Sequence, residues 1–297
     1  MSGMSGFVEQ TVSGRGSGVH VVHGGAGHPV LLLHGFPQTH LAWRHVAASL
    51  AEDFRVVCAD LPGYGVSDPP AGEDGPARYA KRVTAARMVD VMRELGHERF
   101  SIVGHDRGAL VALRAALDHP DTIEHLGVLD VIPTIDNWAA LNGIGGVFAF
   151  HLYLLAQPSD LPERMIAADP DAFFGHFLDT WTAAADAIPA DIRAAYLTAA
   201  RAPRAIHAIC QDYRASAFVD AEHDRIDRDA GRRLTMPVLA MWQDPGDTVL
   251  PFDPQRVWAD WAPDLRTHVL PCGHFLPEER PDEVTAAIRD LIGEDER

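Results

Sequence analysis

The sequence predicts an α/β protein with a mainly parallel sheet flanked by helices. Short apolar segments alternate with helix-forming segments in both outer parts of the chain, as expected for βαβ units. Several segments, such as Val30–Leu33, are continuous apolar runs, which are typical of strands covered on both faces. Over residues 133–231 the alternation stops and helix formers rich in Ala take over. We therefore expect a sheet-containing core of residues 1–132 and 232–297, with residues 133–231 inserted as a helical cap.

The elements follow from these patterns in chain order. Apolar runs predict strands at Val19–Val22, Val30–Leu33, Phe54–Cys58, Ser101–Val103, Ile123–Leu129, Met236–Trp242 and Arg266–Leu270. Helices are predicted over about His40–Ala51, Arg78–Leu95, Arg107–His119 and Glu283–Ile292, and Val257-Trp258 continues the strand–helix order after the cap. Active residues of such sheets gather at the carboxyl ends of the strands, where His34, Asp106 and Asp130 stand.

The composition argues against several classes of function. Apolar residues make up 47% and charged residues 23% of the 297 residues, which is typical of a globular protein. The net charge of −17 argues against nucleic acid or an anionic membrane as a partner. Cys58, Cys210 and Cys272 are widely spaced and no metal-binding motif occurs, so we expect neither disulfides nor a metal. With no secretory pattern at the N-terminus, these features predict a cytoplasmic protein.

One motif stands out at the join between a predicted strand and helix. Gly104-His-Asp-Arg-Gly108 has the form glycine, any residue, nucleophile, any residue, glycine, in which the glycines allow a sharp turn that projects the middle side chain. A serine there would indicate an esterase or a peptidase, but this chain has Asp106. A carboxylate at such a turn can attack an electrophilic carbon and form an ester with the protein.

The ester would need a general base to activate water. His274 has the position for it, in a loop between the last strand and the last helix. Two carboxylates are candidates to orient His274. Asp130 comes directly after the predicted strand Ile123–Leu129, and Asp247 comes after the predicted strand Met236–Trp242. The chain order nucleophile, acid, histidine matches a known arrangement with either acid, and of the two we favour Asp130.

The tetrahedral intermediate of ester hydrolysis would need backbone donors for its oxyanion. The amides of Phe36 and Arg107 are the natural pair. One comes from the loop His34-Gly-Phe-Pro37, and the other belongs to the residue after the nucleophile.

Together, the motifs resemble those of the α/β-hydrolase superfamily, and most closely those of the haloacetate (fluoroacetate) dehalogenases. The resemblance spans nearly the whole chain and rests on these segments: His34–His40, Asp60–Asp68, Gly104–Gly108, Ala116–Asp121, Leu129–Thr134, Leu155–Pro158, Leu161–Glu163, Asp212–Ala215, Glu222–Asp224 and Gly273–Glu279. It implies the α/β-hydrolase fold with the cap inserted after the sixth strand, an organohalide substrate and water, no cofactor, and a homodimer.

The resemblance also implies roles for individual residues. Asp106 would be the nucleophile, His274 the base and Asp130 its partner. The pocket for substrate and departing halide would be formed by Arg107, His151, Tyr213 and Trp181, with Leu110 and Leu152 at two positions where this chain departs from the family.

Those departures concern the substrate rather than the reaction. The family holds the substrate carboxylate with two arginines, but here Arg107 is followed three residues later by Leu110. The family also places a tryptophan after the cap histidine, whereas Leu152 follows His151 here. We therefore expect an organohalide that is larger or less charged than fluoroacetate.

Two other functions fit parts of the pattern. Epoxide hydrolases share the aspartate nucleophile and usually use two cap tyrosines to protonate the epoxide oxygen. Tyr213 could be one of them, and Tyr153 could be the other if the cap register shifts by one residue. A ligand-binding homologue without catalysis is the third hypothesis; in it, replacing His274 would leave ligand binding unchanged.

Overall fold

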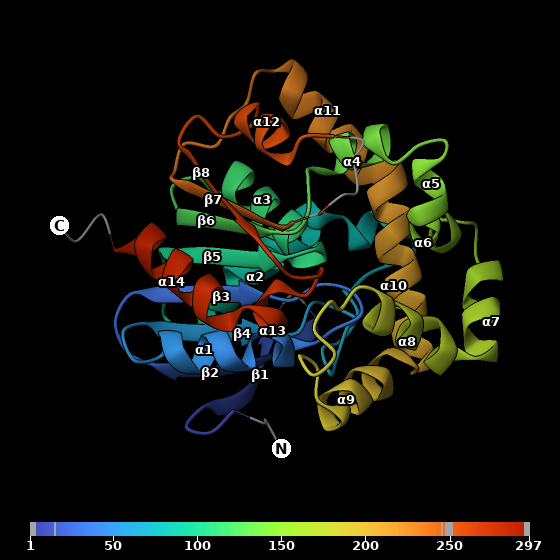
Figure 1. The fold of residues 1–297 in the computed structure, drawn as a ribbon, viewed down its shortest axis with the longest axis horizontal. Coiled ribbons are helices and arrows are strands. Elements are labelled where there is room, and N and C mark those ends of the chain that lie inside the picture. Colours follow the sequence, from blue (N-terminus) through green and yellow to red (C-terminus); the bar gives the residue numbers. More distant parts are fainter. Residues whose placement is uncertain (1–3, 15, 245, 247–251, 294–297) are drawn as a thin grey trace.

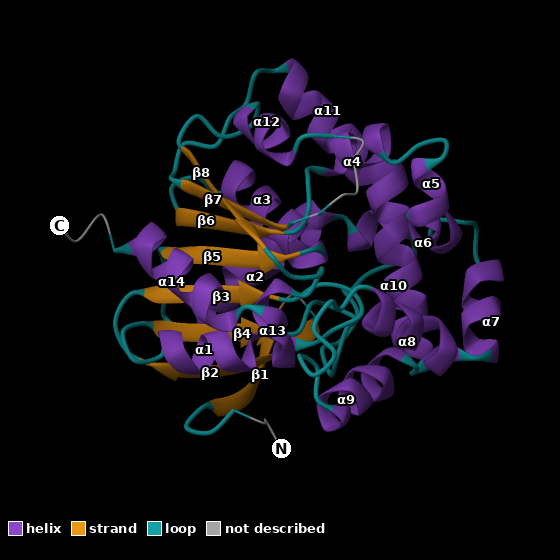
Figure 2. Ribbon diagram, viewed as in Figure 1, coloured by secondary structure: helices purple, strands orange, loops and turns teal. Residues whose placement is uncertain are grey.

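The computed structural model describes residues 4–14, 16–244, 246 and 252–293, which form one sheet flanked by helices (Figures 1 and 2). The strands are β1 (Val8–Gly14), β2 (Ser17–Gly25), β3 (Pro29–Leu33), β4 (Arg55–Ala59), β5 (Phe100–His105), β6 (Ile123–Leu129), β7 (Val238–Gln243) and β8 (Leu265–Leu270). Their spatial order is β1-β2-β4-β3-β5-β6-β7-β8. β2 is antiparallel to both of its neighbours, and all other neighbouring pairs are parallel. The predicted α/β architecture is confirmed.

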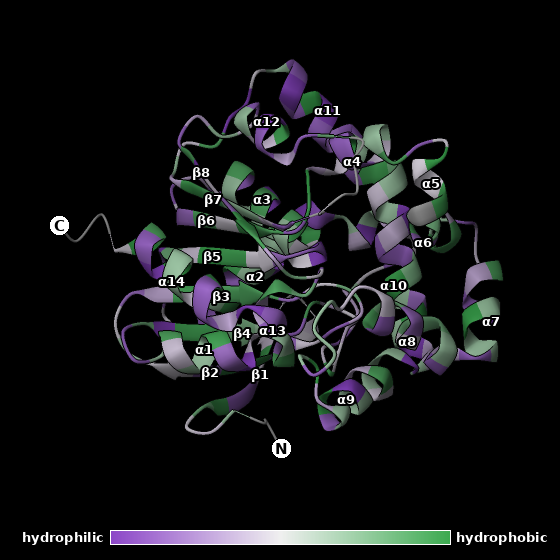
Figure 3. Ribbon diagram, in the orientation of Figure 1, coloured by the Kyte–Doolittle hydropathy of each residue, from purple (hydrophilic) through white to green (hydrophobic). Residues whose placement is uncertain are grey.

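Helices cover both faces of the sheet. On one face, α1 (Arg44–Leu50) packs against α14 (Pro281–Ile292). On the other face, α2 (Lys81–Glu94) packs against α3 (Arg107–Asp118). The residues of β3 alternate between the two faces. Val30 and Leu32 join the hydrophobic cluster of α1 and α14, whereas Leu31 and Leu33 join the cluster of α2 and α3. Both faces of this strand are therefore buried, which explains its continuous apolar sequence, and α3 and β5 are largely hydrophobic in Figure 3.

The helical region between β6 and β7 lies beyond the carboxyl ends of the parallel strands (Figure 2). We call it the inserted region. Its helices are α4 (Thr134–Ala140), α5 (Gly145–Phe148), α6 (Phe150–Leu155), α7 (Leu161–Ala168), α8 (Pro170–Thr180), α9 (Ala190–Ala200), α10 (Pro203–Ala215), the π-helical turn η3 (Ser216–Asp220) and α11 (Ala221–Asp229). It follows the sixth strand, as expected.

Some element predictions need correction. β1 was not predicted, because most of its side chains are exposed and its sequence lacks an apolar run. The helix expected over His40–Ala51 is a 3₁₀ turn, η1 (His40–Trp43), followed by α1. The helix expected from Arg78 is likewise a 3₁₀ turn, η2 (Pro76–Tyr79), followed by α2.

The C-terminal part completes the core. α12 (Pro254–Ala259) lies between β7 and β8 and contains Val257-Trp258, and the short α13 (Leu276–Glu279) precedes α14. Over the described ranges, no helix combines the length and the apolar character needed to cross a membrane.

Candidate active site

Asp106 sits at a strained turn between β5 and α3. Its backbone has φ 48° and ψ −116°, a region that non-glycine residues rarely adopt. The flanking glycines are required by close packing. A Cβ on Gly104 would lie 2.3 Å from the backbone of Gly108, and a Cβ on Gly108 would lie 2.4 Å from the carbonyl oxygen of Leu33. The start of α3 is thus pressed against the sheet, and Asp106 is held at the carboxyl end of β5.

The loop after β3 contacts the Asp106 carboxylate directly. The N–H of Phe36 donates to Oδ1 of Asp106 at 2.8 Å. Gly35 makes this approach possible, because a Cβ there would lie 2.5 Å from both Cβ and Oδ1 of Asp106. The N–H of Arg107 is the first in α3 and therefore has no acceptor within the helix. His34 has another role: its Nδ1 donates to the Gly35 carbonyl and its Nε2 accepts from the N–H of Leu61, which fixes the loop.

Asp130 and His274 form a largely buried pair beside Asp106. Nδ1 of His274 donates to Oδ2 of Asp130 at 2.6 Å. Nε2 of His274 is buried and has no hydrogen-bond partner among the described residues. Asp130 has φ 52°, a second positive value at a non-glycine residue. Of the two candidate acids, Asp130 is the one seen beside His274, since Asp247 lies outside the described residues.

Gln243, at the end of β7, is a site residue that the sequence analysis missed. Its backbone N–H donates to Oδ1 of Asp130 at 3.0 Å, and its side-chain Nε2 donates to Oδ2 at 2.9 Å. With His274, these donors hold the carboxylate in one orientation. The only signal in the sequence is a polar residue at the end of an apolar strand, which is too common to indicate a role.

Opposing effects act on the pKa of His274. Burial alone would lower it, but the hydrogen bond and charge of Asp130, with the charge of Asp106, raise it above the usual 6.5. Beneath it, Nε2 of His105 donates to the backbone carbonyl of His274 at 2.7 Å. Burial and the neighbouring His274 lower the pKa of His105 to about 4, so this ring stays neutral and acts as a fixed support.

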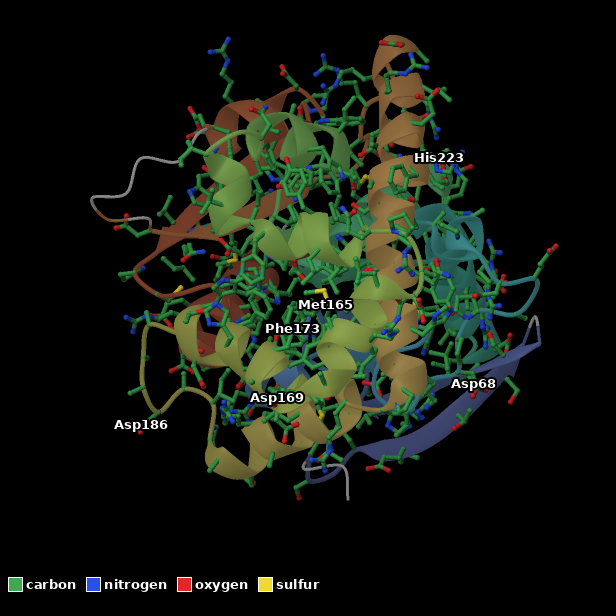
Figure 4. The ribbon with its side chains drawn as sticks, turned by 90° about the vertical axis from the view of Figure 1, so that its right-hand side faces the viewer. Asp68, Met165, Asp169, Phe173, Asp186 and His223 are labelled. Atoms are coloured by element: carbon green, nitrogen blue, oxygen red, sulfur yellow. The ribbon has the colours of Figure 1, made fainter. Side chains whose placement is uncertain are left out.

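A cavity of about 680 Å³ connects these groups with the inserted region. Asp106, Asp130 and His274 lie on its wall. The cavity wall includes five of the six predicted pocket residues, Arg107, Leu110, His151, Leu152 and Trp181, whereas Tyr213 is not among the residues that line it. Figure 4 looks onto the inserted region that covers this end of the sheet, with Met165 and Phe173 near the middle of the view.

Aromatic residues pack tightly between Asp106 and the inserted region. The ring of His151 stacks on Phe36 with 6.0 Å between centroids and lies 5.8 Å from Tyr213 and 5.0 Å from Trp181. Trp181 in turn lies 4.9 Å from His274. Burial lowers the pKa of His151 to about 3, so its imidazole is neutral. Burial and the charge of Asp106 raise the pKa of Tyr213 well above its usual value.

Tyr153 lies elsewhere. Its side chain is 38% exposed, and its O–H donates to the carbonyl of Leu141 at 2.8 Å. It does not line the cavity. The register shift that would make it a second cap tyrosine does not occur.

The Arg107 side chain lines the cavity, but it is committed to a partner in α10. Its Nε donates to Oδ2 of Asp212 at 2.7 Å and its Nη2 to the Asp212 carbonyl at 3.1 Å. Tyr213 covers the guanidinium at 4.2 Å from its ring centroid, and Lys81 contacts the same Asp212 carboxylate. Burial disfavours these charges, yet the ion pairs raise the pKa of Arg107 and lower that of Asp212. The Arg107 guanidinium is therefore positively charged, and the negative charge of Asp212 balances it.

One cluster among the described residues has the composition of a metal site. Ligand atoms of His20, His40 and Asp60 lie within 4.8 Å of one another. However, Oδ1 of Asp60 already accepts from the N–H and Nδ1 of His40, at 2.8 and 2.9 Å. None of the three lines the cavity. The cluster holds the loop after β4 and has no part in the site around Asp106.

The fold and the elbow geometry define an α/β hydrolase. The family model for the alpha/beta hydrolase fold matches residues 28–281, and the chain belongs to this family. It is 40% identical over 290 residues to a fluoroacetate dehalogenase from Burkholderia sp., covering 97% of this chain and 95% of that protein. It is 30% identical over 274 residues to a soluble epoxide hydrolase from Corynebacterium sp., covering 91% and 92%. A solved structure of a candidate epoxide hydrolase from Pseudomonas aeruginosa is 42% identical, with a TM-score of 0.92 over 97% of this chain and 96% of that one.

The Asp130–His274 contact leads to a prediction about titration. In the folded wild-type protein the pKa of His274 should lie above 6.5. The Asp130–His274 pair therefore stabilises the folded state below pH 6.5, and this stabilisation is lost as the pH rises through the pKa that His274 has in the folded protein. Asp130→Asn removes the charge but leaves the burial, so the pKa of His274 should fall below 6.5. NMR titration of the imidazole resonances would measure both values.

Asp121→Asn, at an exposed carboxylate, is the matched control and should leave the titration of His274 unchanged. A pKa that stays above 6.5 in Asp130→Asn would contradict the assignment of the shift to this pair.

Proposed function

We propose that this α/β hydrolase is a dehalogenase that cleaves the carbon–halogen bond of a small organohalide through an ester with Asp106. The observation that carries the proposal is the Asp106 carboxylate at a nucleophile elbow, with one oxygen held by an amide and a His–Asp pair beside it. Residues 133–231 would act as the cap that encloses the substrate. The dehalogenase relative, similar over nearly its whole length, supports the same reaction.

The first step is a displacement at carbon. Oδ1 of Asp106 is occupied by the Phe36 N–H, which leaves Oδ2 to attack. A carbon–oxygen bond forms as the carbon–halogen bond breaks, and the halide leaves with the bonding electrons. His151, which lines the cavity with Trp181, would donate an N–H to the halide. The ring of Tyr213 lies 5.8 Å from that of His151, and its O–H would be the second donor. Neutral donors suit a halide, because it needs hydrogen bonds but no proton.

The second step is hydrolysis of the ester. Nε2 of His274 takes a proton from water, and the resulting hydroxide attacks the carbonyl carbon of Asp106. The Phe36 and Arg107 amides stabilise the oxyanion. The bond from that carbon to Oδ2 then breaks, and the departing oxygen takes the proton held by His274, so that the product leaves as an alcohol containing the Oδ2 atom. The water oxygen remains on Asp106, whose carboxyl group then releases the other proton of the water. The overall change is organohalide plus water to alcohol, halide and a proton.

Ester formation prepares His274 for this role. The negative charge of Asp106 helps to raise the pKa of His274, and esterification removes that charge. The pKa of His274 therefore falls in the intermediate, when a neutral imidazole is required as the base.

Epoxide hydrolysis is the second candidate, favoured by the shared aspartate and by the 30% identical relative. Opening an epoxide requires a proton for a strongly basic alkoxide. His151, whose pKa is lowered to about 3, is neutral, and Tyr213 has a raised pKa, so both are weak acids. Tyr153 does not line the cavity, and its O–H is bonded to the Leu141 carbonyl. These features favour halide as the leaving group. The gathering of Asp106, His274 and Asp130 argues against a ligand-binding protein without catalysis.

His274→Asn should trap the ester. The carboxylate can still attack, but no base remains to activate water, so chloroacetamide should add its acetamide group to Asp106. Mass spectrometry of the peptide that contains Asp106 would detect the added mass. Asp106→Asn is the control and should remain unmodified. Turnover in His274→Asn at the wild-type rate would contradict the assigned base.

The leaving group separates the two enzyme classes. Wild-type protein should release halide from haloacetates, haloacetamides and longer haloalkanes, and should produce little diol from styrene oxide. Ion chromatography and diol analysis would measure the two products in parallel. Diol formation without halide release would reverse the order of the two candidates.

Leu110→Arg should improve binding of anionic substrates. Leu110 lies one turn into α3 and lines the cavity, so an arginine there can reach a carboxylate. A charge-assisted hydrogen bond of about 1.5–3 kcal/mol would lower the KM for chloroacetate roughly 10- to 100-fold. Leu110→Met, which adds no charge, is the matched control. Equal KM values for the two variants would show that position 110 does not limit carboxylate binding.

A further inference from the structure

The cavity is much larger than a haloacetate requires. Its volume of about 680 Å³ lies in the range of pockets for drug-sized ligands, whereas a haloacetate has five non-hydrogen atoms. The wall continues from Asp106 along α4 and the turn after it, and along the segments that flank the β7–α12 connection. The residues of this outer part are mostly apolar: Ile132, Ala140, Leu141, Ile144, Leu152, Trp242, Phe252 and Pro254.

Among the described residues, the cavity wall holds no lysine or arginine other than Arg107. The Nε and Nη2 of Arg107 both donate to Asp212. The Asp106 carboxylate lies in the same wall, while that of Asp130 is bonded to Gln243 and His274. A substrate carboxylate would therefore meet the negative charge of Asp106, and the positive charge of Arg107 beside it is already balanced by Asp212.

We infer that the preferred substrate is an uncharged organohalide with an apolar chain of several carbons, which lies along the outer part of the cavity with its halogen-bearing carbon at Asp106. This inference rests on the proposed dehalogenase function. The far end of such a chain reaches the mouth of the cavity at Ile144, whose side chain is 79% exposed. Polar neutral groups find a partner at the Asn137 amide, which also lines the wall.

Three compounds with the same leaving group test the inference. Chloroacetate is charged, chloroacetamide is its neutral counterpart, and N-butyl-2-chloroacetamide adds the chain. Burial of each methylene adds roughly fourfold to binding, so kcat/KM from chloride release should rise in this order, with at least tenfold between the first compound and the last. Chloroacetate as the best substrate would overturn the inference.

A binding measurement separates this inference from the proposed reaction. Acetate, acetamide and N-butylacetamide carry no leaving group, and calorimetry would give their affinities for the wild-type protein. Tightest binding by N-butylacetamide supports the inference, and tightest binding by acetate overturns it. Absence of chloride release from all three chloro compounds would instead overturn the proposed function, whatever the ranking of these affinities.

Substitutions on α4 test where the apolar chain of the substrate lies. Ala140→Trp fills the outer cavity and should reduce the ratio of kcat/KM between N-butyl-2-chloroacetamide and chloroacetamide to about one. Ala139→Trp is the matched control, because Ala139 is exposed on the same helix and does not line the cavity. It should preserve the wild-type ratio. An unchanged ratio in Ala140→Trp would show that the chain does not lie along α4.

Discussion

The close approach of α3 to the sheet is the constraint on which the site depends. Without side chains at Gly104 and Gly108, the first turn of the helix packs directly on the backbone of β5 and on the end of β3. This contact enforces the positive φ of Asp106 and brings its carboxylate to the amide of Phe36. The backbone conformation of Asp106 is unfavourable in free energy, and the packing around it offsets this, as is usual at functional sites. The Asp106 side chain is therefore positioned by the backbone around it.

A second constraint joins the core to the inserted region. Arg107 follows the nucleophile and is bonded to Asp212 in α10, which Lys81 from the start of α2 also contacts. All three residues are largely buried, and breaking one partner would leave an uncompensated charge. The same bonds that position α10, and with it Tyr213, also neutralise Arg107. The orientation of the cap and the charge of the cavity thus depend on one ion-pair network.

The sequence predicted the features that are encoded locally. The limits of β6, the elbow at Asp106 and the helical insertion all follow from short patterns. The chain order fits both Asp130 and Asp247, and the structure shows Asp130 beside His274. β1 escaped prediction because its side chains are mostly exposed, and such a strand is defined by its pairing with β2. The bonds of Gln243 to Asp130 and of Arg107 to Asp212 join residues more than a hundred positions apart. No short sequence pattern predicts such partners. Only the three-dimensional arrangement therefore shows that the charge of Arg107 is balanced by Asp212.

The position of Leu110 has an evolutionary consequence. Leu110 lies one turn of α3 beyond Asp106, and both side chains line the cavity. A single codon change at position 110 alters the charge presented to the substrate without moving the nucleophile, its amide donor or the His–Asp pair. A lineage can therefore exchange one class of substrate for another while retaining the same carboxylate, amide donor and His–Asp pair.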